Sequence, residues 1–142
     1  MKLKEVLKGK PEGVITAKPG ISILDGIQLM CDKKVGSVMV IADNGDLQGI
    51  LTERDILIFC AKRKGDITGA AIDEAMTRDL IIATLDTGVN EAMKMMTNHR
   101  FRHLPIMEDS KPVAIISIGD LVKARLEDMS VEVKYLRDYI NT

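Results

Sequence analysis

The chain has 142 residues, of which 46% are apolar and 29% are charged, and its 20 basic and 21 acidic side chains leave a formal net charge of −1. This length fits one compact domain or two small repeats. The low net charge and the scarcity of aromatic residues argue against a nucleic-acid-binding protein, because such proteins use basic stripes and stacking platforms. No apolar run reaches the roughly 18 residues that cross a bilayer, and the first residues lack a signal-type apolar run. We therefore expect a cytoplasmic protein that binds neither nucleic acid nor membrane.

The sequence contains an internal repeat. The segment that begins at Val14 matches the one that begins at Leu80, and the segment that begins at Gly49 matches the one at Ala114. Each half is typical of a short strand, a helix, a hairpin of two apolar runs and a second helix, which makes a β-α-β-β-α unit of about 60 residues. A unit this small rarely buries enough apolar surface by itself. We therefore predict an α/β (α+β) fold in which two copies, related by a pseudo-two-fold axis, share one core.

The predicted elements follow the same order in both copies. The first copy has a strand at 14–17, a helix from Ile23, apolar runs at 38–42 and 49–51, and a helix at 53–62. After a linker at 64–71, the second copy has a strand at 80–83, a helix from Val89, apolar runs at 104–107 and 113–116, and a helix at 118–129. The Asn44-Gly45 pair is a strong hairpin signal, whereas residues 109–112 give a weaker one.

A further amphipathic helix is predicted at 129–142, after the second copy. Met129, Val133, Leu136 and Ile140 recur on one of its faces. This apolar face needs to be covered. It either docks on its own module or covers a partner subunit in a homodimer.

Two signatures end the last strand of each copy. Thr52 is followed three residues later by Asp55, and Ser117 is followed in the same way by Asp120. A hydroxyl and a carboxylate at this spacing fit a capping box at a helix N-terminus. The same groups, at the carboxyl end of a strand beside a positive helix end, suit a sugar diol and its phosphate. The two interpretations do not exclude each other.

A basic cluster precedes the apolar strand of the second copy. Arg100, Arg102 and His103 lie within four positions, and strand alternation sends the two arginines to one face and His103 to the other. Either these side chains are solvated, or they bind phosphate, for which the guanidinium fork is suited. Aligned with Arg102 and His103, the first copy has Ser37 and Val38, so the two sites are expected to be unequal.

Arg54 stands on the first turn of a predicted helix, where the helix dipole disfavours a cation. It either contacts a phosphate or an acidic partner, or forms a surface ion pair with Asp55 or Glu53.

Catalytic and metal-binding motifs are missing from the sequence. There is no Ser-His-Asp arrangement, HExxH motif, Walker loop or GxGxxG loop. Cys31 and Cys60 have no second ligand at metal spacing, and we predict that both are buried free thiols. His99 and His103 lie on a predicted turn and strand, where a four-residue spacing does not converge on a metal. We expect neither an enzyme nor a metal site.

The repeated unit resembles a known family. The motifs that carry the resemblance are GILTERDI from Gly49, RHLPI from Arg102 and IISIGDLV from Ile115. They are similar to those of the cystathionine-β-synthase (CBS) domain pair, or Bateman module, of the stand-alone prokaryotic type. The resemblance divides the chain into repeat 1 at 7–65, repeat 2 at 72–128 and the C-terminal amphipathic helix at 129–142.

The resemblance implies a regulatory module, without a catalytic cofactor, that binds an adenosyl ligand such as AMP, ADP, ATP, NAD or S-adenosylmethionine in the cleft between the repeats. It also implies a homodimer and a regulated protein encoded elsewhere. The residues that carry over are Thr52, Asp55, Ser117 and Asp120 for the ribose, Ile15, Thr16, Ile81 and Ile82 for the adenine, and Arg102 and His103 for phosphate, with Arg54 and Arg100 as further basic candidates.

This chain departs from the family pattern at two points. Ala114 replaces the usual glycine of the second signature, and the first copy lacks basic residues at Ser37 and Val38. We therefore favour the second-repeat site. The alternative is a ligand-free structural or interaction dimer with vestigial clefts.

Overall fold

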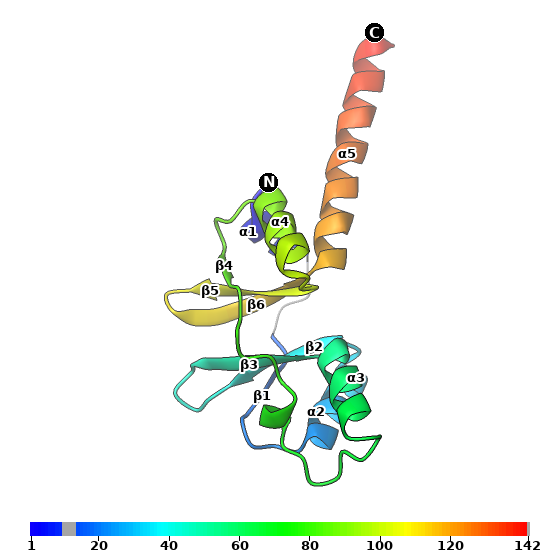
Figure 1. Cartoon of the computed structure of the whole chain (residues 1–142). Coiled ribbons are helices and arrows are strands. Elements are labelled where there is room, and N and C mark those ends of the chain that lie inside the picture. The colour runs from blue at the N-terminus through cyan, green and yellow to red at the C-terminus, as the bar shows by residue number, and fades with distance from the viewer. Residues whose placement is uncertain (10–13, 142) are drawn as a thin grey trace.

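The computed structural model describes residues 1–9 and 14–141 (Figure 1). The helices are α1 (Leu3–Leu7), α2 (Ile23–Lys33), α3 (Glu53–Lys62), the short 3-10 helix η1 (Ile72–Glu74), α4 (Val89–His99) and α5 (Ile118–Ile140). The strands are β1 (Thr16–Ala17), β2 (Ser37–Ile41), β3 (Leu47–Thr52), β4 (Ala83–Thr84), β5 (His103–Glu108) and β6 (Lys111–Ser117). None of the described helices is long and apolar enough to cross a membrane.

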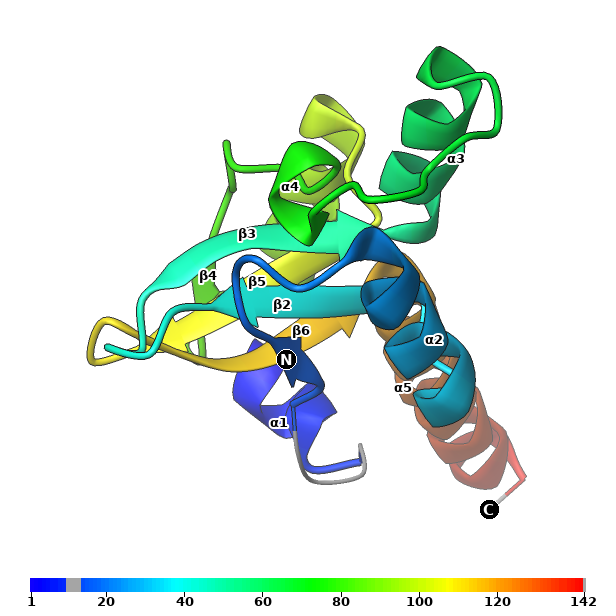
Figure 2. The ribbon, with the colours of Figure 1, turned by 90° about the horizontal axis from the view of Figure 1, so that it is seen from below.

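The two repeats build the same sheet. The strand orders are β1-β2-β3 and β4-β5-β6, with a parallel first pair and an antiparallel second pair in each. The predicted β-α-β-β-α plan is therefore confirmed, although β1 and β4 are only two residues long. The sheets face each other, with the helices on their outer sides (Figure 1), and the view from below shows one hairpin lying over the other (Figure 2).

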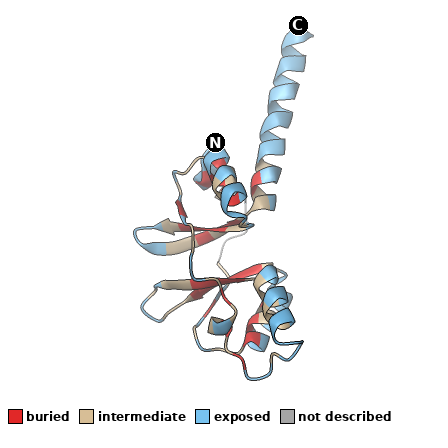
Figure 3. Cartoon of the chain, in the orientation of Figure 1, coloured by how far each residue is buried: buried red, intermediate tan, exposed pale blue. Residues whose placement is uncertain are grey.

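Each repeat has its own apolar core, so the prediction of one shared core is wrong. One buried cluster includes Val38, Val40 and Leu51, and the other includes Leu104 and Ile116. Because successive side chains of a strand point to opposite faces, these residues pack on the helices of their own repeat. Buried positions follow both sheets in Figure 3.

The opposite sheet faces form a layer between the repeats. Met39 pairs with Ile50 across β2 and β3, and Pro105 pairs with Ile115 at the corresponding place in β5 and β6. Met39 and Ile50 are buried although neither belongs to a core cluster. The repeats are also joined by a hydrogen bond of 2.9 Å from Lys111 Nζ to the Asn44 carbonyl oxygen. This layer holds the two sheets together.

The repeats exchange the segments that precede them. Leu3 and Val6 of α1 come before repeat 1 in the chain, yet they belong to the core of repeat 2. Conversely, Ile72 and Met76 lie between α3 and β4, within the segment predicted as repeat 2, and belong to the core of repeat 1. The sequence analysis predicted no helix at the position of α1. The predicted start of repeat 1 at residue 7 leaves Leu3 and Val6 outside both repeats.

The last helix differs from the prediction in length. Residues 118–140 form a single helix of 23 residues, so the expected division into two helices at Met129 is wrong. The chain has no Gly or Pro between Leu121 and Ile140 that would end it. Its outer part is exposed throughout and stands away from both modules (Figures 1 and 3), so the apolar face does not dock on its own module. The predicted end at Thr142 lies outside the described residues.

The tighter hairpin turn is in repeat 2, although the stronger hairpin signal in the sequence lies in repeat 1. Asp109 and Ser110 both have positive φ, at 51° and 64°, and form the two-residue connection typical of a tight hairpin. In the longer hairpin loop of the first repeat, residues 42–46, only Gly45 has positive φ, at 91°. Both cysteines are free, as predicted, but Cys31 is exposed and Cys60 is half-buried.

Candidate functional site

The candidate residues of each repeat gather at one edge of its sheet. In repeat 2, β5 begins at His103, which pairs with Ser117 at the end of β6, and Ile82 directly precedes β4. Because β4 runs parallel to β5, these ends meet at the same edge. Two strand spacings, about 10 Å, separate the first strand from the third. Repeat 1 arranges Thr16, Ser37 and Thr52 in the same way.

The signature of repeat 1 is a closed capping box. The Thr52 backbone N–H donates to Asp55 Oδ2 over 2.9 Å, and the Asp55 N–H donates to Thr52 Oγ1 over 3.2 Å. The Thr52 hydroxyl also donates to Asp55 Oδ2, at 3.0 Å. The other carboxylate oxygen, Oδ1, accepts from the Thr77 hydroxyl at 2.7 Å. Both oxygens of Asp55 are therefore engaged within the protein.

The signature of repeat 2 is also a capping box. The Ser117 N–H donates to Asp120 Oδ2 over 2.9 Å, and the Asp120 N–H donates to Ser117 Oγ over 3.1 Å. The capping interpretation is thus confirmed for both signatures. It also fixes each carboxylate at the end of a strand and beside the positive end of a helix.

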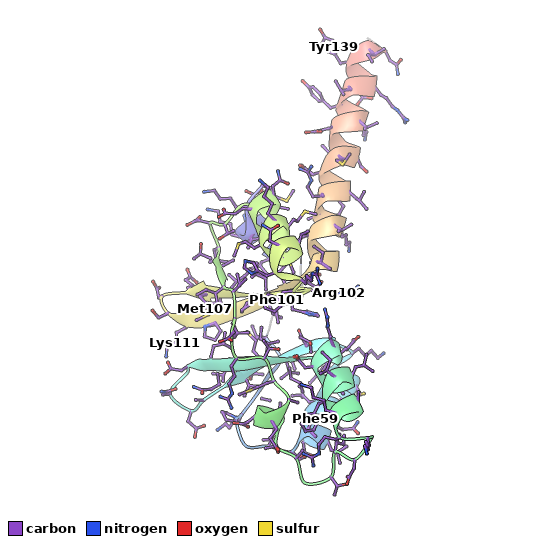
Figure 4. All side chains as sticks on the ribbon, viewed as in Figure 1. Phe59, Phe101, Arg102, Met107, Lys111 and Tyr139 are labelled. Carbon is purple, nitrogen blue, oxygen red and sulfur yellow. The ribbon has the colours of Figure 1, made fainter. Side chains whose placement is uncertain are left out.

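Arg102 and His103 stand beside the second signature. The Ile118 N–H at the start of α5 donates to the Arg102 carbonyl oxygen over 2.8 Å, and the Arg102 side chain is exposed (Figure 4). The matching bond in repeat 1 joins the Glu53 N–H to the Gly36 oxygen over 3.2 Å. The counterparts of Arg102 and His103 are therefore Gly36 and Ser37, one position earlier than the sequence alignment gave.

Arg100 does not lie on the strand. It caps α4 in a left-handed conformation, with φ 59°, and β5 begins only at His103. The expectation that alternation places Arg100 and Arg102 on one strand face is therefore wrong. Arg54 is exposed on the first turn of α3, and no ion pair is seen between it and Asp55 or Glu53.

His103 also reaches the first repeat, which the sequence did not reveal. A Cβ atom added to Gly36 would lie 2.9 Å from Glu53 Oε1 and 3.6 Å from His103 Nε2. The imidazole of repeat 2 thus lies near the start of α3, where Glu53 adds a negative charge. Because Gly36 has no side chain, there is room for Glu53 and His103 beside it. No local sequence pattern indicates this contact.

The residues assigned to the adenine divide into two pairs. Ile15 and Ile81 are half-buried and pack on the core of their own repeat. Thr16 and Ile82 are exposed, and the Ile82 side chain retains 50% of its accessible surface. An exposed isoleucine at the same sheet edge as Ser117 and Arg102 offers an apolar contact for a flat base. Within residues 1–9 and 14–141, no group of three or more His, Cys, Asp or Glu side chains is placed to hold a metal ion.

The sequence model of the CBS domain matches the chain twice, at residues 6–62 and 71–127. The chain belongs to the CBS domain family. It is a CBS domain pair, which is a regulatory module, and the two matched segments correspond to the two sheets and their helices.

Similar proteins support this assignment. A 17.7 kDa protein from Acidianus ambivalens is 36% identical over 115 residues, which are 80% of this chain and 68% of that protein. The crystal structure of the CBS-domain-containing protein ATU1752 from Agrobacterium tumefaciens superimposes with a TM-score of 0.84 at 34% identity, covering 88% of this chain and 99% of that one. The CBS domain pair of protein MJ0100, solved with 5'-methylthioadenosine and S-adenosyl-L-methionine, gives 0.78 at 26% identity, covering 90% and 98%.

Proposed function

We propose that this CBS pair is a regulatory module that binds an adenosyl ligand at the sheet edge of repeat 2. One observation carries the proposal: strand register places His103 opposite Ser117, and the Ile118 N–H donates to the carbonyl oxygen of Arg102. Two basic residues therefore adjoin the helix N-terminus that Ser117 and Asp120 cap. Binding there alters the contacts of the module with a second copy or with a regulated protein, provided that the ligand prefers one of the two states.

The roles of the residues follow from their chemistry. Asp120 accepts hydrogen bonds from the ribose hydroxyls, since a carboxylate matches a vicinal diol, and the Ser117 hydroxyl donates to the ribose or accepts from it. Ile81 and Ile82 contact the adenine through the main chain and an apolar side chain. Arg102 and His103 contact phosphate where the ligand carries one, with Arg100 as a further candidate at the end of α4.

The site of repeat 1 is proposed to bind more weakly. Thr52 and Asp55 correspond to Ser117 and Asp120, and the Thr77 hydroxyl donates to Asp55. Gly36 and Ser37 supply no positive charge at the places of Arg102 and His103. Ile15 and Thr16 retain the adenine role and Arg54 is the basic candidate at this edge.

The related MJ0100 pair supports the adenosyl class, because its structure holds two adenosyl compounds and its fold superimposes over most of this chain. The alternative function is a ligand-free interaction dimer. The capping boxes favour this alternative, because they account for the shared geometry of both signatures without any ligand.

A thermal-shift panel of AMP, ADP, ATP, NAD, S-adenosylmethionine and GTP tests the proposal. A ligand at about 100 times its Kd stabilises the protein by about 2.7 kcal/mol, which corresponds to several degrees in Tm for a domain of this size. We expect at least one adenosyl ligand to shift the Tm and GTP to shift it less.

The informative variant is Asp120→Asn, because the amide oxygen still accepts from the Ser117 N–H while the charge and one acceptor are lost. Asp25→Asn is the matched control, since Asp25 occupies the same N3 position behind the Ser22 cap of α2, away from either signature. We expect both variants to fold and only Asp120→Asn to lose the ligand shift. If no adenosyl ligand shifts the wild-type Tm, or if both variants retain the shift in full, the proposed site is wrong.

A further inference from the structure

The outer part of α5 carries an apolar seam with the spacing of a coiled coil. Its residues alternate at intervals of four and three along the helix: Val122, Leu126, Met129, Val133, Leu136 and Ile140. This is the a/d pattern of a heptad repeat, with Leu126, Val133 and Ile140 at a and Val122, Met129 and Leu136 at d. Such a strict period of 3.5 defines a narrow seam for another helix.

The structure leaves this seam uncovered by its own chain. Leu121, which packs on the core of repeat 2, is 0% exposed, whereas the next residue, Val122, is 41% exposed and Leu136 is 57% exposed. Ile118, Leu121 and Ala124 hold the base of α5 to its module, and none of them belongs to the seam. Two shallow hollows adjoin the seam, one lined by Val122 and Leu126 and extending to Val131, the other lined by Met129, Val133 and Arg137.

A helix of this length is marginally stable when only its base is packed. The helix rises about 1.5 Å per residue, so the part beyond Ala124 extends for more than 20 Å from the module. Its apolar side chains need a partner surface of the same length and period. A second copy of the chain provides one.

The charges beside the seam discriminate between the two orientations of such a pair. In a parallel pair, Glu132 at position g faces Arg137 at position e of the partner helix, an attractive contact. In the antiparallel pair that aligns the six seam residues, Glu132 faces Glu132 of the second copy and Lys123 faces Arg137, so both contacts are repulsive. Branched Val133 and Ile140 at a, with Leu136 at d, also match the preference of parallel two-stranded coils.

We infer that α5 pairs with α5 of a second copy, as a parallel two-stranded coiled coil along Val122–Ile140. The pair places the two modules at the same end of the coil and leaves the sheet edges of both repeats outside it. The seam and its charges carry this inference, which does not rest on the proposed ligand site.

Sedimentation equilibrium of the full chain tests the seam. We expect the wild type to approach twice the chain mass of 15.7 kDa as its concentration rises. Leu136→Lys places a charge in the seam and is expected to give the monomer mass. Val131→Lys is the matched control, because Val131 is also apolar and is 68% exposed on the same helix, but lies at position f, outside the seam. Circular dichroism verifies that both variants keep their helix content.

Disulfide trapping tests the orientation. In a Cys31→Ser, Cys60→Ser background, Leu136→Cys forms a covalent dimer under oxidation if the helices are parallel, because residue 136 then faces itself. Val131→Cys does not. The inference is overturned if the wild type is a monomer at all concentrations, if Leu136→Lys and Val131→Lys have the same mass, or if a dimer persists that Leu136→Cys does not cross-link.

Discussion

The two repeats share a backbone plan and differ in what they present at the sheet edge. Both have a hairpin, a capping box and a hydrogen bond from the first N–H of the closing helix to the residue before the hairpin. In repeat 2 that residue is Arg102, and in repeat 1 it is Gly36. Duplication therefore conserved the groups that build the fold, whereas the side chains available to an anion diverged.

Asp55 also has a hydrogen-bond partner outside its capping box. Asp55 receives a hydrogen bond of 2.7 Å from Thr77, which lies on the segment between the repeats and is held to β3 by backbone hydrogen bonds with Ile50. This arrangement ties the first signature to the connecting segment. The comparison teaches that the two repeats share the capping motif and differ in the charge of the residues beside it.

The exchange of segments between the cores provides the prediction with the largest effect. Leu3 and Ile72 are fully buried. Leu3 belongs to the core of repeat 2 and Ile72 to the core of repeat 1. Leu3→Ala and Ile72→Ala are each expected to lower the free energy of unfolding by about 2–5 kcal/mol, because each leaves a cavity. Hydrogen exchange will show faster exchange in repeat 2 for Leu3→Ala and in repeat 1 for Ile72→Ala.

Leu57→Ala is the control, because Leu57 is exposed on α3 and its truncation is expected to change stability by less than about 0.5 kcal/mol. Faster exchange in repeat 1 alone for Leu3→Ala would contradict the exchange of segments.

The difference in charge between the two edges provides the second prediction. Arg102→Ala is expected to weaken binding of AMP about tenfold or more, since a hydrogen bond to a charged group contributes about 1.5–3 kcal/mol. Binding of adenosine, which has no phosphate, should change little. Arg54→Ala, at the edge of repeat 1, should affect neither ligand. Isothermal titration of both ligands measures this, and equal losses for AMP and adenosine would rule out a phosphate contact.

The turns of the two hairpins provide a smaller effect. Ser110 adopts positive φ at the place where a tight hairpin prefers Gly, whereas the turn of repeat 1 already has Gly45 at such a position. Ser110→Gly is expected to raise the free energy of unfolding by about 1 kcal/mol, because a left-handed conformation costs a side-chain-bearing residue about that amount. Urea denaturation measures the change. Ser130→Gly, in the interior of α5, should lower stability, and a loss of stability for Ser110→Gly would contradict the argument.

The smallest effect concerns an ion pair that only repeat 1 has. The Lys18 ammonium donates to Asp43 over 2.7 Å, and this hydrogen bond and charge hold the pKa of Asp43 below its usual value. A lowered folded-state pKa stabilises the protein above the unfolded-state pKa, and the contribution disappears as pH falls through the folded-state pKa. Because both groups are fully exposed, stability should hardly respond.

Lys18→Met is expected to raise the pKa of Asp43 towards its ordinary value in an NMR titration. The pKa of Asp66, which is lowered by hydrogen bonds from Thr68, serves as the internal control and should not move. An unchanged pKa of Asp43 would show that the ion pair does not persist in solution.

Local signals predicted most of the fold. The repeat, the caps at Thr52 and Ser117, and the apolar spacing of α2 and α4 depend on residues a few positions apart, and the structure confirms them. The core partners of Leu3 are set by tertiary packing across the whole chain, so no local pattern indicated them. The unbroken α5 was open to prediction, because the sequence after Leu121 contains no helix-breaking residue.

The candidate site was predicted as residue types and only partly as geometry. Spacing placed Asp55 and Asp120 at helix starts, but the hydrogen bond from Thr77 to Asp55 joins residues far apart in the sequence. The approach of His103 to Gly36 likewise depends on how the two sheets face each other. The one-residue error in aligning Arg102 with its counterpart was corrected only by strand register.

The most direct measurement is isothermal titration of wild type, Asp55→Asn and Asp120→Asn with the adenosyl ligand that gives the largest thermal shift. Both substitutions occupy the same capping position and retain an acceptor for the cap, and Asp55→Asn also changes a group that accepts from the Thr77 hydroxyl. The account predicts that Asp55→Asn binds like wild type and that Asp120→Asn binds at least about tenfold more weakly. Loss of binding in Asp55→Asn, with Asp120→Asn unaffected, would contradict it.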